Sequence, residues 1–154
     1  MTANQNMAVD NVTVIIPNGV FGAVQQYKNH DPKRIQQVHI TAQQVQLQMT
    51  KVHYEQALAE FEEYLYHFQQ QIAHNSEDVQ YSAYERVEYS EDYRTIRFYL
   101  TADQYFQHRF LEINELELVI DALYYQLYKG VQPSVTFEYV DVETHSELGK
   151  MSYP

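Results

Sequence analysis

Six short segments of the chain alternate apolar and polar residues or concentrate β-branched and aromatic side chains, as strands that bury one face do. They cover residues 12–16, 20–27, 34–40, 79–89, 93–100 and 134–142. Turn-forming residues separate them. Pro17-Asn18-Gly19 follows the first segment, and Ser90-Glu91-Asp92 divides the fourth from the fifth. The pattern therefore predicts several strands joined by tight turns.

Two longer segments follow helical spacing instead. The first, predicted from Thr41 to about His74, carries an apolar stripe whose members are separated alternately by four and three residues. This Tyr54–Ile72 stripe consists of Tyr54, Leu58, Phe61, Leu65, Phe68 and Ile72. The second predicted helix runs from Thr101 to Lys129, where Gly130 is a typical helix-ending residue.

A near-repeat links the two helices to the strands before them. Residues 34–44 and 94–104 each alternate and then enter a Thr-Ala-x-Gln motif, which has the form of a capping box at a helix start. We therefore expect Thr41 and Thr101 to occupy equivalent helix starts. The match also suggests an internal duplication of residues 20–75 and 79–130.

The start of the first helix has a second interpretation. At about 100° per residue, Val45, Met49 and Val52 project nearly opposite to the Tyr54–Ile72 stripe. A continuous helix would then bury different sides in its two halves, so it either bridges two packing partners or is broken near Thr50. Residues 45–49 also alternate, which is compatible with a strand.

These elements predict an α+β fold. It consists of two β-hairpin–long-helix units and a C-terminal strand, with an antiparallel sheet and helices packed on one face. We expect a flexible N-terminus over residues 1–8, a single domain over residues 9–143, and a polar tail over residues 144–154.

Charge narrows the choice of partner. The chain has 154 residues and a net charge of −11, and six basic against nineteen acidic residues follow Lys51. Such a balance opposes binding to phosphate backbones and to anionic membranes, so the expected partner is another, basic protein. The chain has no cysteine, which excludes disulfides and thiolate sites. Without a signal peptide or membrane span, we expect a cytoplasmic protein.

The residues that could form a catalytic or metal site give weaker patterns than the strands and helices do. His53, Glu60, His67 and His74 form one column of the first helix, but steps of seven residues separate neighbours by about 10 Å, too far to share one metal ion. No nucleophile elbow, Walker loop or dinucleotide fingerprint occurs. We therefore predict no catalytic residue, metal site or cofactor.

The aromatic and acidic residues favour a non-enzymatic interaction protein. The Tyr54–Ile72 stripe would pair two chains as a homodimer or seat a partner helix. The hairpin predicted from residues 79–89 and 93–100 would supply further contacts, because tyrosine is enriched at interfaces and surface acids attract basic partners. Its predicted contact residues are Tyr84, Glu85, Glu88, Tyr89, Glu91, Asp92 and Tyr93.

Two alternatives belong to other functional classes. The acidic hairpin would mimic nucleic-acid charge and block a basic cleft, as small inhibitors from viruses or mobile elements do. A small-ligand binder or hydrolase would use a His/Glu cleft formed by His39, His108 and Glu112, which lie beside the two Thr-Ala-x-Gln motifs. Arg34 and Arg94 each begin a predicted strand, where they either bind an anion or only add solubility.

Overall fold

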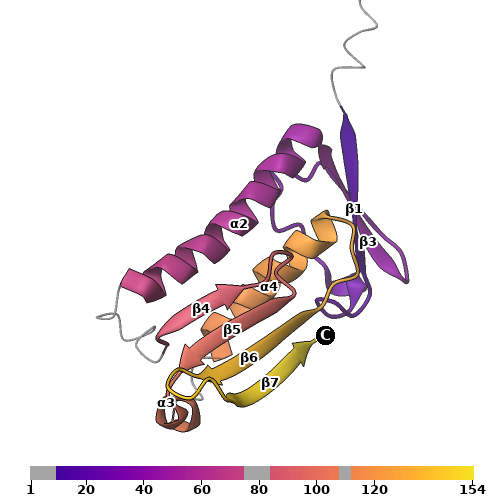
Figure 1. The fold of residues 1–154 in the computed structure, drawn as a ribbon. Coiled ribbons are helices and arrows are strands. Elements are labelled where there is room, and N and C mark those ends of the chain that lie inside the picture. The colour runs from indigo at the N-terminus through magenta and orange to yellow at the C-terminus, as the bar shows by residue number, and fades with distance from the viewer. Residues whose placement is uncertain (1–9, 75–83, 108–111) are drawn as a thin grey trace, which may run out of the picture. The chain divides into compact units, whose positions relative to one another are not determined.

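The computed structural model describes residues 10–74, 84–107 and 112–154, with the side chains of residues 112–114 excepted. It confirms the α+β fold, but with two separate sheets (Figure 1). The chain divides into two compact units. Unit 1 comprises Met1–Glu60 and Leu127–Val131, and unit 2 comprises Phe61–Gln126 and Gln132–Pro154.

Unit 1 contains a three-stranded antiparallel sheet. Its order is β1 (Asn11–Pro17), β3 (Gln44–Thr50) and β2 (Gln37–Ile40), so β3 is the central strand. Alternation along the strands places one set of side chains in the core and the other set outside. The buried set on β1 and β3 is Val14, Ile16, Val45, Leu47 and Met49.

The first predicted helix begins later than expected. Helix α2 covers Lys51–His74, and the residues before it form strand β3, so the strand interpretation of residues 45–49 is confirmed. Thr50 is the residue that caps α2, because its Oγ1 accepts a hydrogen bond of 3.1 Å from the N–H of His53. The alternating pattern prevails because β3 pairs with a strand on each side.

Thr41 and Thr101 therefore differ in structure, and the prediction that both begin helices is wrong. Thr41 lies in the β2–β3 turn, where its N–H donates to the carbonyl oxygen of Gln44. Thr101 does begin a helix, α3 (Ala102–Gln107). Its Oγ1 accepts from the N–H of Gln104, whose Oε1 accepts from the N–H of Thr101. This reciprocal pair is a capping box.

The prediction of a strand over residues 20–27 is also wrong. This segment forms a turn and a short 3-10 helix, η1 (Val24–Gln26). Gly19 and Gly22 have φ angles of 94° and 95°, in the left-handed region that glycine tolerates best. These backbone angles interrupt an extended strand.

Unit 2 contains a four-stranded sheet in the order β4 (Arg86–Tyr89), β5 (Thr95–Leu100), β6 (Val135–Asp141) and β7 (Glu147–Tyr153). The predicted C-terminal strand is β6, and β7 lies within the predicted polar tail. Strands β5 and β6 are parallel, so this sheet is mixed, whereas the sheet of unit 1 is antiparallel as expected. The helical connection through α3 and α4 (Glu112–Tyr128) allows this parallel crossover.

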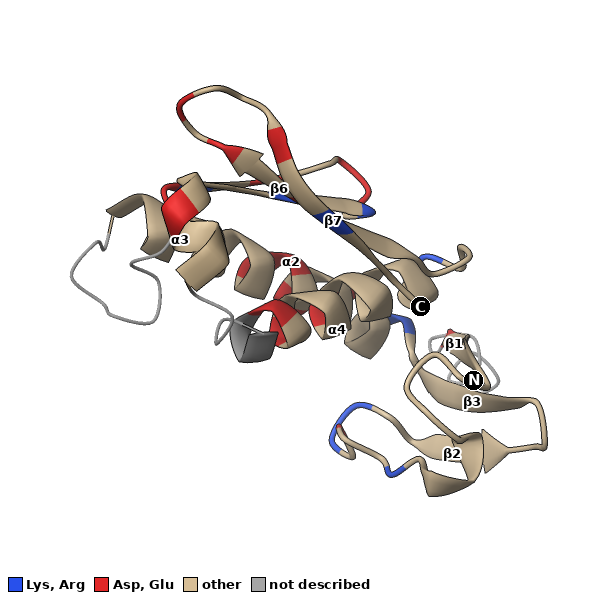
Figure 2. Cartoon of the chain, turned by 90° about the horizontal axis from the view of Figure 1, so that it is seen from below, with Lys and Arg blue, Asp and Glu red and all other residues tan. Residues whose placement is uncertain are grey.

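Aromatic rings form the centre of unit 2. Phe98 on β5 stacks between Tyr84, at 4.7 Å between ring centroids, and Tyr139, at 5.4 Å. Phe137 meets the same ring edge-on at 5.1 Å. Helix α4 and the second half of α2 lie on one side of this sheet (Figures 1 and 2). Several residues on the other side of the sheet are charged, among them Arg97, Glu138 and Lys150, which form ion pairs.

Helix α2 also protects an edge of the sheet. The side-chain amide of Gln69 donates to the carbonyl oxygen of Val87 on edge strand β4, at 2.9 Å. The hydroxyl of Tyr89 donates in return to the carbonyl oxygen of Leu65, at 2.6 Å. The first of these contacts occupies a backbone carbonyl that an open edge strand would offer to another chain, and the second holds a β4 side chain on the helix.

Candidate functional site

The Tyr54–Ile72 stripe packs largely against its own chain. Leu65, Phe68 and Ile72 are buried in unit 2, with exposed fractions of 0%, 9% and 6%. Phe61 is half-buried and stacks on Tyr124, at 5.7 Å between ring centroids. The C-terminal part of the stripe, from Phe61 to Ile72, therefore packs in unit 2 and contributes to its core.

The first two stripe residues belong to unit 1 and are half-buried. The ring of Tyr54 stacks on Tyr128 at 5.8 Å, and its hydroxyl donates to the carbonyl oxygen of Tyr128 at 2.6 Å. Leu58 lies one helical turn further along α2. This packing leaves the stripe little free apolar area for a second chain.

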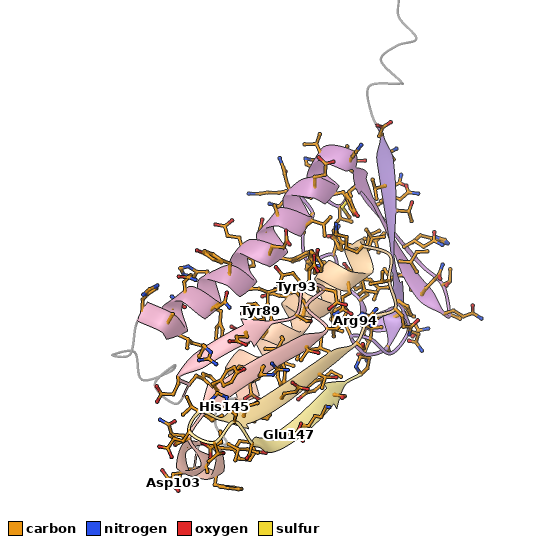
Figure 3. All side chains as sticks on the ribbon, viewed as in Figure 1. Tyr89, Tyr93, Arg94, Asp103, His145 and Glu147 are labelled. Atoms are coloured by element: carbon orange, nitrogen blue, oxygen red, sulfur yellow. The ribbon has the colours of Figure 1, made fainter. Side chains whose placement is uncertain are left out.

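The three hairpin tyrosines are also structural. Tyr84 is buried and its hydroxyl donates to Glu115 at 3.1 Å, while Tyr89 donates to α2. Tyr93 meets Tyr125 edge-on at 4.8 Å between ring centroids, and it adopts a positive φ of 59° in the turn. Tyr89 and Tyr93 lie on the side of the hairpin that faces α2 (Figure 3).

Two of the four hairpin acids have cationic neighbours. Glu88 pairs with Arg86 at 2.9 Å. Asp92 accepts from the backbone N–H of Arg94 and from the hydroxyl of Ser90, and the first of these bonds is the main cause of its lowered pKa. Glu85 and Glu91 are exposed. The hairpin thus presents less uncompensated charge than the sequence predicts.

A groove between α2 and α4 lies within unit 2 and was not identified from the sequence. Its volume is about 370 Å³. Phe68 and Leu118 are the buried residues of its lining, whereas Tyr64 is 51% exposed and Ile120 is 37% exposed. The other lining residues are His67, Gln71, Glu117 and Asp121. Leu116, one turn before Ile120 on α4, is 54% exposed and extends the apolar surface.

The groove lies in the strongly acidic part of the chain. Unit 2 contains seventeen acidic and five basic residues, a net charge of −12, whereas unit 1 contains four acidic and five basic residues. Figure 2 shows acidic residues on α4 and on the β6–β7 connection. An apolar groove with carboxylates beside it favours a partner that presents apolar side chains flanked by cations.

The described cations of unit 2 are paired away from the groove lining. Four of the five lie in the described residues, and each pairs with a carboxylate on the sheet or in the β4–β5 turn. Arg97 contacts Glu138 at 2.8 Å, and Lys150 contacts the same carboxylate at 3.7 Å. Arg86 and Arg94 pair within the hairpin. None of these four residues lines the groove.

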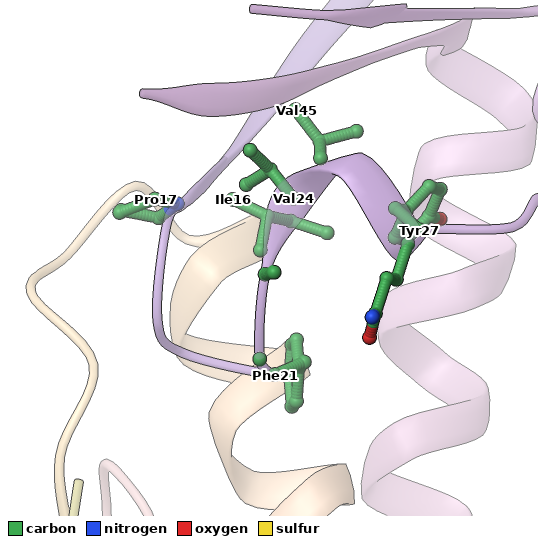
Figure 4. Close-up of a pocket in the computed structure, with 9 residues that line it drawn as sticks. Ile16, Pro17, Phe21, Val24, Tyr27 and Val45 are labelled. Atoms are coloured by element: carbon green, nitrogen blue, oxygen red, sulfur yellow. The ribbon is translucent and has the colours of Figure 1, made fainter. Parts of the chain in front are cut away.

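A smaller cavity of about 150 Å³ lies in unit 1 (Figure 4). Ile16, Val24, Val45 and Phe21 supply apolar walls, and Tyr27 lies beside them. The hydroxyl of Tyr27 is hydrogen-bonded to Nδ1 of His30 at 2.9 Å. The lining contains no carboxylate and no histidine, so it offers no pair of groups for acid–base catalysis.

The remaining sequence candidates do not form a described site. His39 is exposed on β2, whereas His108 and the side chain of Glu112 lie outside the described residues. Arg34 pairs with Asp31 and Glu60. Within the described residues no group of three metal-ligating side chains is close enough to hold a metal ion.

Arg94 has a structural role. Its guanidinium donates to the hydroxyl of Ser134 at 2.9 Å and to the carbonyl oxygen of Gln132 at 2.7 Å. These bonds join the start of β5 to the segment that precedes β6. The guanidinium is therefore engaged with its own chain rather than held open for an anion.

Comparisons with protein-family models, with curated proteins and with solved structures found no match. Among the described helices, none combines the length and the apolar character needed to cross a membrane.

A sequence signal for the groove exists in α4. Leu116 and Ile120 share helical spacing with Leu123 and Leu127, yet Leu118 and Ala122 are apolar on another side of the helix. A helix that is apolar around most of its circumference is either buried on all sides or leaves one apolar face exposed. The structure buries Leu118 and Ala122 and exposes Leu116 and Ile120.

Proposed function

We propose that this chain is a non-enzymatic protein-binding protein that engages a basic partner through the acidic surface of unit 2. The observation that carries the proposal is the separation of charge, with a net charge of −12 in unit 2 and near neutrality in unit 1. Clustered carboxylates raise the association rate with cationic proteins and repel anionic ones.

The groove between α2 and α4 supports a binding function over catalysis. It is lined by exposed apolar side chains, Tyr64 and Ile120, beside the carboxylates of Glu117 and Asp121. Exposed apolar surface with a polar rim is typical of sites where proteins meet.

Two earlier hypotheses receive less support. Self-association through the Tyr54–Ile72 stripe would require Leu65, Phe68 and Ile72, which are buried in their own unit. Nucleic-acid mimicry by the hairpin would require free carboxylates, yet Glu88 and Asp92 have arginine neighbours. We therefore centre the proposal on the groove and the acids around it.

Selection from a library of random peptides tests the partner's charge without assuming its identity. The immobilised full chain should select peptides enriched in lysine and arginine that also contain apolar residues. Raising the salt concentration from about 0.05 M to about 0.5 M should release most of them, because salt screens exposed charges. Selected peptides that are neutral or acidic would contradict the proposal, and so would a library without binders.

A further inference from the structure

We infer that the groove between α2 and α4 binds an amphipathic helix whose exposed face carries lysine and arginine. This inference rests on the proposed function and adds the conformation of the partner. It is carried by the two helical walls of the groove, by its exposed apolar residues and by the charge around it.

The two walls of the groove are helices, and this favours a helical partner over an extended one. Tyr64, His67 and Gln71 come from α2, and Glu117, Ile120 and Asp121 come from α4. Helices satisfy their backbone hydrogen bonds internally, so these walls offer no strand edge. An extended peptide would leave its own N–H and C=O groups unpaired against apolar side chains, which is costly. A helical partner satisfies these groups itself.

The spacing of the lining residues sets the contact length. Tyr64 and Gln71 are seven residues apart on α2, which is about 10 Å or two helical turns. Two turns of a bound helix present apolar anchors at positions i, i+3 or i+4, and i+7. We expect the apolar side chains of the bound helix to contact Tyr64 and Ile120, the exposed apolar residues of the lining.

Charge makes a second copy of the chain a poor occupant. Helix α2 contains one lysine, Lys51, against four glutamates, and α4 contains acidic residues but no lysine or arginine. Docking either helix beside Glu117 and Asp121 would bring like charges together. The expected occupant is therefore a helix of a different, basic protein.

Two synthetic peptides of about 15 residues, made from leucine, lysine and glutamine in the same proportions, test the inference. One places leucines at helical spacing and the other alternates them. Fluorescence anisotropy with the full chain should show that the helical-pattern peptide binds at least about tenfold more tightly. Circular dichroism should show helix formation on binding.

Matched variants locate the site. Tyr64→Ser combined with Ile120→Ser should weaken binding of the helical-pattern peptide about tenfold. As a control, Tyr66→Ser combined with Met151→Ser also removes two exposed apolar side chains from unit 2, and it should leave the affinity unchanged.

A pair of charge reversals tests the site without removing apolar side chains, so the test still holds if the Tyr64→Ser and Ile120→Ser variant fails to fold. Glu117→Lys should weaken binding about fivefold, whereas Glu147→Lys on β7 (Figure 3) should change it less than about twofold.

The outcomes separate this inference from the proposed function. Equal affinity for both peptides, or equal effects of the two charge reversals, would overturn the helical groove while leaving a charge-driven protein-binding function in place. Absence of binding by both peptides at low salt would count against both.

Discussion

At the residue scale, the most unusual feature is a carboxylate inside the aromatic core of unit 2. Glu115 on α4 is 8% exposed and accepts a hydrogen bond of 3.1 Å from the hydroxyl of Tyr84. Burying a carboxylate is costly unless donors surround it. Tyrosine thus has a structural use in the core of this unit.

Tyr84→Phe should destabilise the chain by about 1–3 kcal/mol, because it removes one of the donors to a buried carboxylate while keeping the ring. Urea denaturation followed by circular dichroism measures the change. Tyr66→Phe, at a side chain that is 61% exposed, is the matched control and should change stability by less than about 0.5 kcal/mol. Equal stability of the two variants would show that Glu115 does not depend on Tyr84.

The tyrosines also predict the response to alkaline pH. Burial raises the pKa of Tyr84, Tyr89 and Tyr139, and it raises the pKa of Tyr93 and Tyr124 to about 12. Unfolded tyrosines ionise near pH 10, so the folded state retains protons that the unfolded state loses. The stabilisation from these neutral tyrosines is complete below about pH 10 and decreases as pH rises further.

A spectroscopic titration of tyrosinate absorbance, recorded together with circular dichroism, tests this expectation. A subset of the tyrosines should ionise only as the fold is lost, in a cooperative step well above pH 10. Ionisation of all fifteen tyrosines near pH 10 with the fold retained would contradict the buried placement.

At the element scale, the sequence predicted whether most segments are helices or strands more accurately than it predicted where they begin and end. Alternation identified β1, β5 and β6, and helical spacing identified most of α2. The capping-box motif misled at Thr41 because the same threonine–glutamine spacing also closes a hairpin turn. Local hydrogen bonding cannot distinguish these outcomes. Pairing of β3 on both sides decides between them, and it depends on residues far away in the sequence.

Thr50→Ala should destabilise the chain by about 1 kcal/mol, because it removes the cap at the start of α2. Thr50→Ser retains the hydroxyl and should preserve most of that stability. Thermal unfolding of the two variants measures the difference. If Ala and Ser behave alike, the hydroxyl of Thr50 does not stabilise the helix start.

At the scale of the whole molecule, composition predicted the acidic character but not its distribution over the fold. The excess of acids after Lys51 is visible in the sequence, and most of it falls in unit 2. The sequence did not reveal that Arg97 pairs with Glu138, because these residues lie on different strands, 41 positions apart in the chain. Helical spacing also groups Leu116 and Ile120 with Leu123 and Leu127, although the first two are exposed and the last two are buried.

The groove was missed for a similar reason. Tyr64 and His67 flank the Tyr54–Ile72 stripe, and periodicity alone assigns such residues to the boundary of a helix face. Their meeting with Glu117 and Ile120 depends on how α2 packs beside α4 in unit 2. Spacing within one helix contains no information about that contact.

A nuclear magnetic resonance titration of the labelled full chain with the helical-pattern peptide tests the central claim most directly. The account predicts that the largest shift changes fall on Tyr64, Gln71, Leu118 and Ile120, which line the groove, while Tyr66 and the residues of β1 remain unchanged. Shift changes confined to the β4–β5 hairpin, or absent at saturating peptide, would contradict it.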